Sequence, residues 1–294
     1  MGQNGHYKKG LKPWDYPLDS LECLCNTHHS AKHDIDVNLD YNIHPKICFS
    51  SDTLYHGCKR FTIRDLINKN ALGNIISIEA SEHIMPWHGG FFMRNWRRKE
   101  KFSGGFMLEK CCHDIDFYNM IVGCRPKRVA SFGGRRSFIP DNKPEKNFEE
   151  YSKYNLFGWE AKAKVFDSDA DIVDHQVAII EYENGATLAF HTNMRVPDEF
   201  RRFAVIGTNG MVEGDFVRGF IKAHDQQNNI ILDEDYGAAF GQSKGHYGAD
   251  NLMLKDINQH LTNPEKINLP VGVKDCIEAG LIAMKIDESR TTGK

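Results

Sequence analysis

Residues 177–193, VAIIEYENGATLAFHTN, decide the fold of this chain. They form two runs with alternating apolar residues on either side of Asn184-Gly185, and an Asn-Gly pair between such runs favours a tight hairpin turn. Residues 200–216, FRRFAVIGTNGMVEGDF, repeat the arrangement around Asn209-Gly210. Strands joined by short hairpins pair antiparallel, so we expect an antiparallel sheet rather than a doubly wound parallel one.

Further segments extend this sheet and add helices to it. Residues 74–84 (NIISIEASEHI) and 128–138 (RVASFGGRRSF) are rich in β-branched and aromatic residues, as strands are. Thr62 and Asp65 resemble a capping pair at the start of a short amphipathic helix that ends near Gly73. The sequence therefore predicts an α+β fold, with a large, mainly antiparallel open sheet and helices on one face.

The end of the chain predicts a further helix. Ile277, Leu281 and Met284 recur at spacings of four and three residues, which places them on one apolar helix face. Residues 1–46, in contrast, are polar and hold neither helical nor strand periodicity for long. We interpret them as an irregular leader.

Composition excludes several classes of protein. The chain has 294 residues, of which 40% are hydrophobic, enough to bury a substantial core. Its 37 Lys and Arg against 40 Asp and Glu give a net charge of -3, so no broad cationic field is present for nucleic acid or anionic lipid. The first twenty residues lack an apolar signal segment, and no run of 18 apolar residues occurs. We expect a cytoplasmic protein whose eight cysteines are reduced.

The densest group of chemically active residues is GGFMLEKCCHDIDFYNMIVG, residues 104–123. If this stretch is helical, Glu109, His113 and Asp116 lie near one face, because residues three and four apart are neighbours on a helix. A histidine between carboxylates suits a general acid or base working near neutral pH. The alternative is that His113 caps the helix and binds only its neighbours, and the residues alone leave both readings open.

Cysteine and histidine raise two further possibilities. Cys111 and Cys112 adjoin His113, but buried structural thiols are the more common role for such residues. A second cluster holds metal-ligand residue types at spacings that fit no standard zinc finger, so we assign no metal site. A metal-dependent hydrolase built on this cluster is the least favoured function. The cluster consists of Cys23, Cys25, His28, His29 and His33.

A third group lies in HIMPWHGGFFMRNWRRKEKFSGG, residues 83–105, where aromatic and guanidinium groups stand between two pairs of glycines. Ring faces for stacking and forked donors for oxygen suit a polyhydroxylated or anionic small ligand, and flexible glycines would let the loop adapt to it. The alternative is a solvated basic loop. We assign His88, Arg94 and Trp96, together with Asp116, to substrate binding.

Dinucleotide-binding motifs are missing from the sequence. No G-x-G-x-x-G occurs, so the tight turn that brings a pyrophosphate to a helix N-terminus is not encoded. Phosphate-binding loops of the Walker type are missing as well. We therefore assign no cofactor-binding residues.

Six segments in order nevertheless resemble the C-terminal part of the Gfo/Idh/MocA family, the relatives of glucose-fructose oxidoreductase and inositol dehydrogenase. The resemblance covers about residues 47–294. The segments are FTIRDLINKNALGNIISIEA, FFMRNWRRKEKFSGGFMLEKCCHDIDFYNMIVG, DHQVAIIEYENGATLAFH, FRRFAVIGTNGMVEGD, GHYGADNLM and AGLIAMKIDESRTTGK.

The resemblance implies a fold and a set of roles. Family members carry an N-terminal Rossmann domain for NAD or NADP, followed by a sheet domain that binds substrate and often mediates oligomerisation. Their histidine aligns with His113, which the resemblance implies as the acid or base facing a substrate hydroxyl. Glu109 occupies the acidic position four residues earlier, where the family more often has Asp. Lys110 matches a subgroup with lysine there and is expected to bind substrate oxygens.

Departures from the family shape the functional expectation. The family's Glu-Lys-Pro motif is absent, and a leader of 46 residues is too short for a dinucleotide fold, which needs two βαβ halves of roughly 30 residues each. We expect residues 1–46 to be a leader or remnant of a lost domain, and residues 47–294 to form a substrate-binding and oligomerisation domain. On this hypothesis the chain is the substrate domain of a sugar or polyol oxidoreductase, binds no cofactor alone and is inactive alone.

Two alternatives remain. The chain is either a non-catalytic assembly or ligand-binding module that pairs with a complete homologue, or an enzyme completed by a separate Rossmann subunit. The expected partners are a small carbohydrate-like molecule, and a second copy bound through the sheet face or a Rossmann-containing homologue.

Overall fold

The computed structural model describes residues 63–145, 164–235, 257–266 and 273–294. The cluster of cysteines and histidines between residues 23 and 33 lies outside these ranges, as does the predicted leader. The strands are β1 (Ile75–His83), β2 (Pro126–Gly134), β3 (His175–Tyr182), β4 (Thr187–Asn193), β5 (Arg202–Gly207), β6 (Gly210–Asp215), β7 (Phe220–Asp225) and β8 (Ile230–Asp235). The α-helices are α3 (Ile63–Asn68), α4 (Pro86–Arg94), α5 (Glu100–Ser103), α6 (Cys112–Val122) and α8 (Val273–Thr292).

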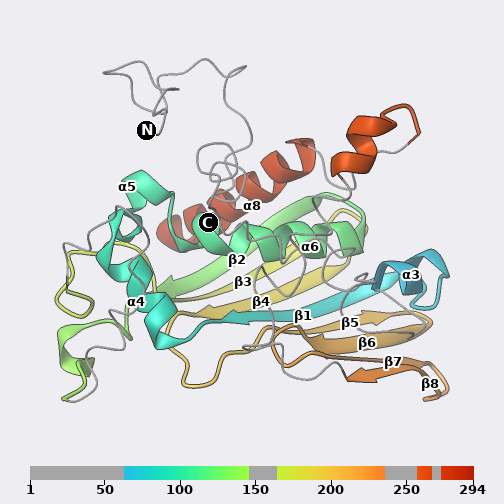
Figure 1. The fold of residues 1–294 in the computed structure, drawn as a ribbon, viewed down its shortest axis with the longest axis horizontal. Coiled ribbons are helices and arrows are strands. Elements are labelled where there is room, and N and C mark those ends of the chain that lie inside the picture. The colour runs from blue at the N-terminus through green and yellow to red at the C-terminus, as the bar shows by residue number, and fades with distance from the viewer. Residues whose placement is uncertain (1–62, 146–163, 236–256, 267–272) are drawn as a thin grey trace.

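The strands form one eight-stranded sheet in the order β2-β3-β4-β1-β5-β6-β7-β8 (Figure 1). Every neighbouring pair is antiparallel except β1 and β4, which are parallel. The predicted open, mainly antiparallel sheet is confirmed. Strand β1 lies between β4 and β5, which both follow it by more than 100 residues in the sequence. Short-range sequence patterns do not specify partners at that distance.

The two predicted hairpins form, but their turns differ. Between β3 and β4, Gly185 has a φ of 86°, a left-handed conformation that glycine adopts without steric cost. Between β5 and β6, Ile206 pairs with Met211, so the turn lies one residue earlier than the predicted Asn-Gly pair. Gly210 instead lies in the strand, where a Cβ would come within 2.4 Å of the His224 carbonyl oxygen. Its role is close packing against β7.

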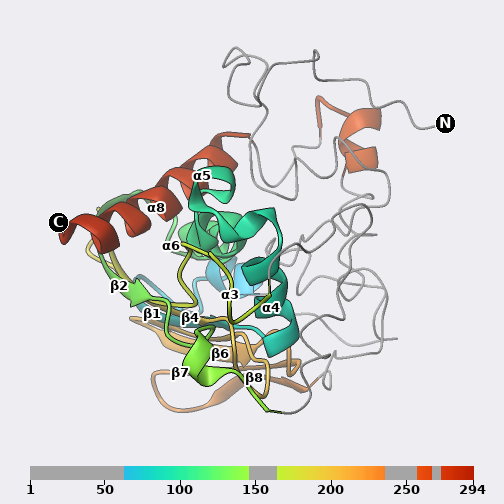
Figure 2. The ribbon, with the colours of Figure 1, turned by 90° about the vertical axis from the view of Figure 1, so that its left-hand side faces the viewer.

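Helices α6 and α8 cover one face of the sheet, as predicted (Figures 1 and 2). The strands alternate accordingly, and side chains such as Ile78, Ile180 and Phe190 are buried beneath the helices. The opposite face carries exposed apolar side chains, among them Phe132 and Ile179. The core therefore lies between one sheet face and one helix layer.

Helix α8 forms as predicted, but its large apolar face points outward. Alanines and isoleucines on its other side face the sheet and α6, because small side chains let the helix approach closely. The buried residues are Ala279, Ile282, Ala283 and Ile286, and the exposed ones include Ile277, Leu281 and Met284. No helix in the described ranges, α8 included, has the length and apolar character needed to cross a bilayer.

Candidate functional site

The predicted catalytic residues lie on a widened helical turn and on the first turn of α6, which follows it directly. Residues Met107–Cys111 form a π-helical turn, η4, that runs directly into α6, and such turns are frequent at functional sites. Glu109, Lys110 and His113 are all buried, with relative exposures of 8%, 7% and 8%. Burial of three ionisable groups within one and a half turns is costly unless each has partners. The partners of the first two are defined below.

Glu109 forms an ion pair with Arg97, whose Nε donates to Glu109 Oε1. The Arg97 guanidinium lies over two rings, 5.1 Å from the Phe91 centroid and 4.4 Å from the Trp96 centroid. Burial raises the pKa of Glu109 to about 7, although Arg97 opposes the shift. The carboxylate is thus poised near neutral pH, but it faces Arg97.

Lys110 belongs to a buried quartet of alternating charges. Its Nζ lies 3.0 Å from Glu82 Oε1, and Arg201 Nε lies 2.5 Å from the other Glu82 oxygen. Arg201 Nε also donates to Asp114 Oδ1 at 2.7 Å. The four side chains are between 2% and 8% exposed. Two positive and two negative groups balance, which is what allows all four to remain buried.

The quartet shapes the chemistry of its neighbours. Burial raises the pKa of Asp114 to about 6, while Arg201 pulls it down. Burial together with Asp114 and Glu82 raises the pKa of the Cys111 thiol far above its usual value. Cys111 and Cys112 are both buried and reduced, so they are structural thiols and poor nucleophiles, as expected.

His113 lies in the first turn of α6, three residues after Lys110. The two carboxylates predicted to flank it are engaged elsewhere, since Glu109 binds Arg97 and Asp116 lies close enough to Asp275 of α8 for their charges to interact. Burial and Asp275 raise the pKa of Asp116 to about 6. Each of these two carboxylates thus has a charged neighbour on another element, and their placement on one face with His113 stays a prediction.

The segment 83–105 holds the predicted substrate-binding residues on helices α4 and η3 (Trp96–Arg98). Arg94 is buried, and burial lowers the pKa of its guanidinium. The His88 ring stacks on Trp87, with centroids 5.3 Å apart. The prediction of flexible glycines is wrong for Gly89, which lies within α4. A Cβ there would come within 1.9 Å of the Met194 carbonyl oxygen, so the glycine is needed for close packing.

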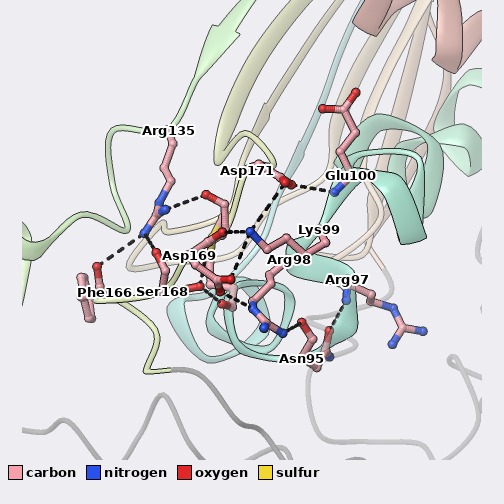
Figure 3. A network of polar contacts seen from close by, with 12 residues as sticks. Asn95, Arg97, Arg98, Lys99, Glu100, Arg135, Phe166, Ser168, Asp169 and Asp171 are labelled. Atoms are coloured by element: carbon pink, nitrogen blue, oxygen red, sulfur yellow. Dashed lines mark hydrogen bonds and ion pairs between the residues drawn. The ribbon is translucent and has the colours of Figure 1, made fainter.

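Polar contacts fix the basic part of this segment, so it is not a freely solvated loop. Arg98 Nε donates to Asp169 Oδ1 at 2.6 Å, and Lys99 Nζ lies 3.1 Å from Asp169 Oδ2 (Figure 3). The backbone N–H of Glu100 donates to Asp171 Oδ1 at 2.7 Å (Figure 3). Residues 95–100 are therefore attached to residues 169–171, which holds the Arg97 side chain toward Glu109.

Sequence patterns missed Glu82, Asp114 and Arg201 as members of the site. Arg97 belongs to the segment expected to bind ligand through its guanidinium groups, but its pairing with Glu109 was not predicted. One signal was available for Glu82: it occupies an inward position of β1, two residues after the buried Ala80, where an apolar residue is expected. A charged residue at such a position requires a buried partner. That partner, Arg201, lies in a distant segment, so the sequence alone did not reveal it.

Histidines also gather on the opposite face of the sheet. The rings of His83 and His191 meet edge to face with centroids 4.9 Å apart, and Asn193 Nδ2 lies 3.1 Å from His83 Nδ1. Burial and His191 lower the pKa of His83 to about 4. Both rings are therefore neutral at physiological pH.

The described ranges do not fit a metal or a dinucleotide. They contain no group of three His, Cys, Asp or Glu side chains placed to hold a metal ion. Their one parallel strand pair is β1 and β4, and β1 is followed by Ile84, Met85 and Pro86 rather than by a glycine-rich turn. A dinucleotide fold requires that turn at the helix N-terminus.

Known proteins share this sequence and architecture. The family described as "Oxidoreductase family, C-terminal alpha/beta domain" (Gfo/Idh/MocA) matches residues 64–291, well over half of the chain. A relative from Bacillus subtilis (strain 168), "Putative oxidoreductase YteT", is 23% identical over 239 residues. The match covers 66% of this chain and 56% of YteT, so the chain spans only about half of that relative.

Solved structures repeat the fold. Levoglucosan dehydrogenase in complex with NADH and levoglucosan superposes with a TM-score of 0.61 at 15% identity, covering 91% of this chain and 69% of that one. An oxidoreductase domain protein from Kribbella flavida also gives 0.61, at 13% identity, covering 86% and 63%. At these identities the likeness is one of fold.

Proposed function

The chain belongs to the Gfo/Idh/MocA oxidoreductase family, and on that premise we propose that residues 47–294 are the substrate-binding part of a dehydrogenase acting on a sugar or polyol. The observation that carries the proposal is the buried group of Glu109 and Lys110 on the π-helical turn and His113 in the first turn of α6. Levoglucosan dehydrogenase, with its bound carbohydrate and NADH, supports the substrate class by fold.

We propose a role for each of these residues from the family resemblance and from the contacts that are known. His113 takes or returns the proton of the substrate hydroxyl as general base or acid. Lys110, kept charged by Glu82, donates hydrogen bonds to substrate oxygens. Arg94, Trp96 and His88 form the wall of the site and contribute aromatic faces and a forked donor, as sugars require. Asp116 is assigned to the rim of the same site.

The hydride carrier is supplied from outside the described ranges. NAD or NADP accepts the hydride in complete members, and a general base alone has nowhere to send it. We propose that residues 47–294 are the substrate and oligomerisation domain, and that a Rossmann domain outside the described residues holds the dinucleotide.

A non-catalytic assembly module is the second candidate. Phe132 is 76% exposed and Ile179 is 52% exposed on the sheet face opposite α6 and α8. Apolar residues gathered on an uncovered face are typical of an interaction surface. On this reading the sheet face binds a second copy or a complete homologue, and the site residues serve to bind a ligand.

Saturation-transfer NMR with levoglucosan, myo-inositol and D-glucose tests the proposal. We expect transfer to at least one of these at millimolar concentration, its loss in His113→Ala, and its retention in His224→Ala, a matched change on distant β7. Transfer that is equal in wild type and His113→Ala would mean that the ligand binds elsewhere. Transfer from none of the three would remove the substrate assignment and favour the assembly module.

A further inference from the structure

Helix α8 presents an apolar stripe to solvent on the side opposite its buried face. The stripe runs along three turns at spacings of four, four and three residues. Its residues are about half exposed: Val273 59%, Ile277 50%, Leu281 55% and Met284 53%. Gly280, which has no side chain, lies next to Leu281 of the stripe. A Cβ added at Gly280 would lie 3.6 Å from Leu108, an ordinary van der Waals contact.

Charged residues border the stripe in a regular order. Four charged residues of α8 lie on either side of Leu281 in the sequence: Lys274 and Glu278 before it, and Lys285 and Glu288 after it. Leu281 and these four residues follow one another at gaps of four and three residues, which keeps them on one line of the helix surface. Read in either direction, the line carries lysine where the reverse reading carries glutamate.

This order is self-complementary about Leu281. In an antiparallel pair of α8 helices in which Leu281 meets Leu281 of the second copy, Lys274 lies directly opposite Glu288. Met284 lies within one residue of the position opposite Ile277, and Lys285 within one residue of the position opposite Glu278. A two-fold axis requires a surface that matches itself in this way.

Existing contacts of these charges do not prevent the pairing. Lys285 Nζ lies 2.6 Å from Glu288 Oε2, and both side chains are more than half exposed. Glu278 accepts from Arg125 Nε at 2.8 Å; Arg125 is exposed and Glu278 is partly exposed, at 31%. Exposed ion pairs contribute little and exchange partners readily. The same side chains are therefore available to a second helix.

We propose that a second copy of this chain docks antiparallel on α8, with Leu281 at the two-fold axis. The surface is distinct from the sheet face, and the proposal does not depend on the oxidoreductase function. Four half-exposed side chains form only a small interface. Weak complexes bury less than about 1,200 Å² in total, and we place this dimer in that class, so its population depends on concentration. Its lysine–glutamate contacts make it sensitive to salt.

Sedimentation equilibrium of the whole chain tests the proposal. The weight-average mass should rise from 33.6 kDa toward twice that value with concentration. Leu281→Glu should abolish the rise. Reversing both lysines (Lys274→Glu with Lys285→Glu) places glutamates opposite glutamates and should weaken association by about tenfold, while reversing all four charges restores the match. Circular dichroism confirms that each variant is folded.

Controls separate this surface from the sheet face. If Phe132→Asp abolishes association and Leu281→Glu does not, the dimer uses the sheet and the proposal is wrong. A wild type that stays monomeric also overturns it. So does a Leu281→Glu variant that melts at lower temperature than wild type at a concentration where both are monomeric, because another part of the chain would then cover α8. Rescue by the four-charge reversal supports the proposal, and a four-charge variant as weak as the two-charge one contradicts it.

Discussion

Replacing Arg201 by Met should unbalance the buried quartet. Arg201 Nε contacts carboxylate oxygens of both Glu82 and Asp114, and its side chain is only 7% exposed. Without it, two buried carboxylates share the single positive charge of Lys110. Breaking a buried ion pair by removing one partner costs about 3–5 kcal/mol, because the remaining charge is left uncompensated.

The expected loss is measurable by urea denaturation followed by circular dichroism. For a domain of this size the unfolding free energy falls by about 2 kcal/mol per molar urea, so the midpoint should fall by about 1.5–2.5 M. Arg202→Met is the matched control, since the adjacent arginine is 52% exposed and should change stability by less than about 0.5 kcal/mol.

The loss should depend on pH in a defined direction. Removing Arg201 raises the folded-state pKa of Asp114 further above the value of the unfolded chain, so the folded state binds an extra proton. Stability of the variant then falls as pH rises from about 4 through the raised pKa, and the deficit is smaller at pH 5 than at pH 8. Adding Asp114→Asn should recover part of the loss at pH 8. A deficit no larger than that of Arg202→Met, or one that does not change with pH, would refute the charge-balance argument.

Three further outcomes follow from the same contacts. The contribution of Glu109 to stability should decline as pH rises from 4.5 toward 7, because its pKa is raised in the folded state, so Glu109→Gln should make the pH-stability curve fall less steeply over that range than wild type does. The contribution of His83 has the opposite sign and should decline as pH drops from 6.5 toward 4 while His83 takes up a proton; a His83→Asn variant whose curve over that range is unchanged from wild type would exclude this histidine. Gly89→Ala should lower the unfolding free energy by about 1–3 kcal/mol through its clash with Met194, whereas Gly280→Ala in α8 should be neutral or stabilising by up to about 1 kcal/mol in the same urea assay.

Sequence patterns predicted what local chemistry determines. The hairpin at Asn184-Gly185 and the helix beginning near His113 follow from turn chemistry and periodicity, and both form. The insertion of β1 between β4 and β5 did not follow, because no local rule specifies a partner more than 100 residues away.

The outward face of α8 shows a second limit of sequence patterns. Periodicity correctly places Ile277, Leu281 and Met284 on one face, but it does not show which face meets the sheet. The smaller residues opposite, such as Ala279 and Ala283, take that position. Periodicity identifies a shared surface, and packing decides its partner.

The sequence predicted which residues of the proposed site are close in the chain, and the structure added their partners. Glu109 and Lys110 lie on the π-helical turn and His113 follows in the first turn of α6. Their partners Arg97 and Glu82 come from other elements, and side-chain contacts between distant segments have no signature in one sequence.

Hydrogen exchange measured by mass spectrometry tests the central claim most directly, because it locates each ligand on the chain. Added separately, a carbohydrate that passes the NMR test and NADH should behave differently. We predict that the carbohydrate slows exchange in residues 91–116, around the π-helical turn, and that NADH leaves the described residues unchanged. Protection by NADH together with no response to the carbohydrate would contradict the assignment of this domain as the substrate-binding part of the family.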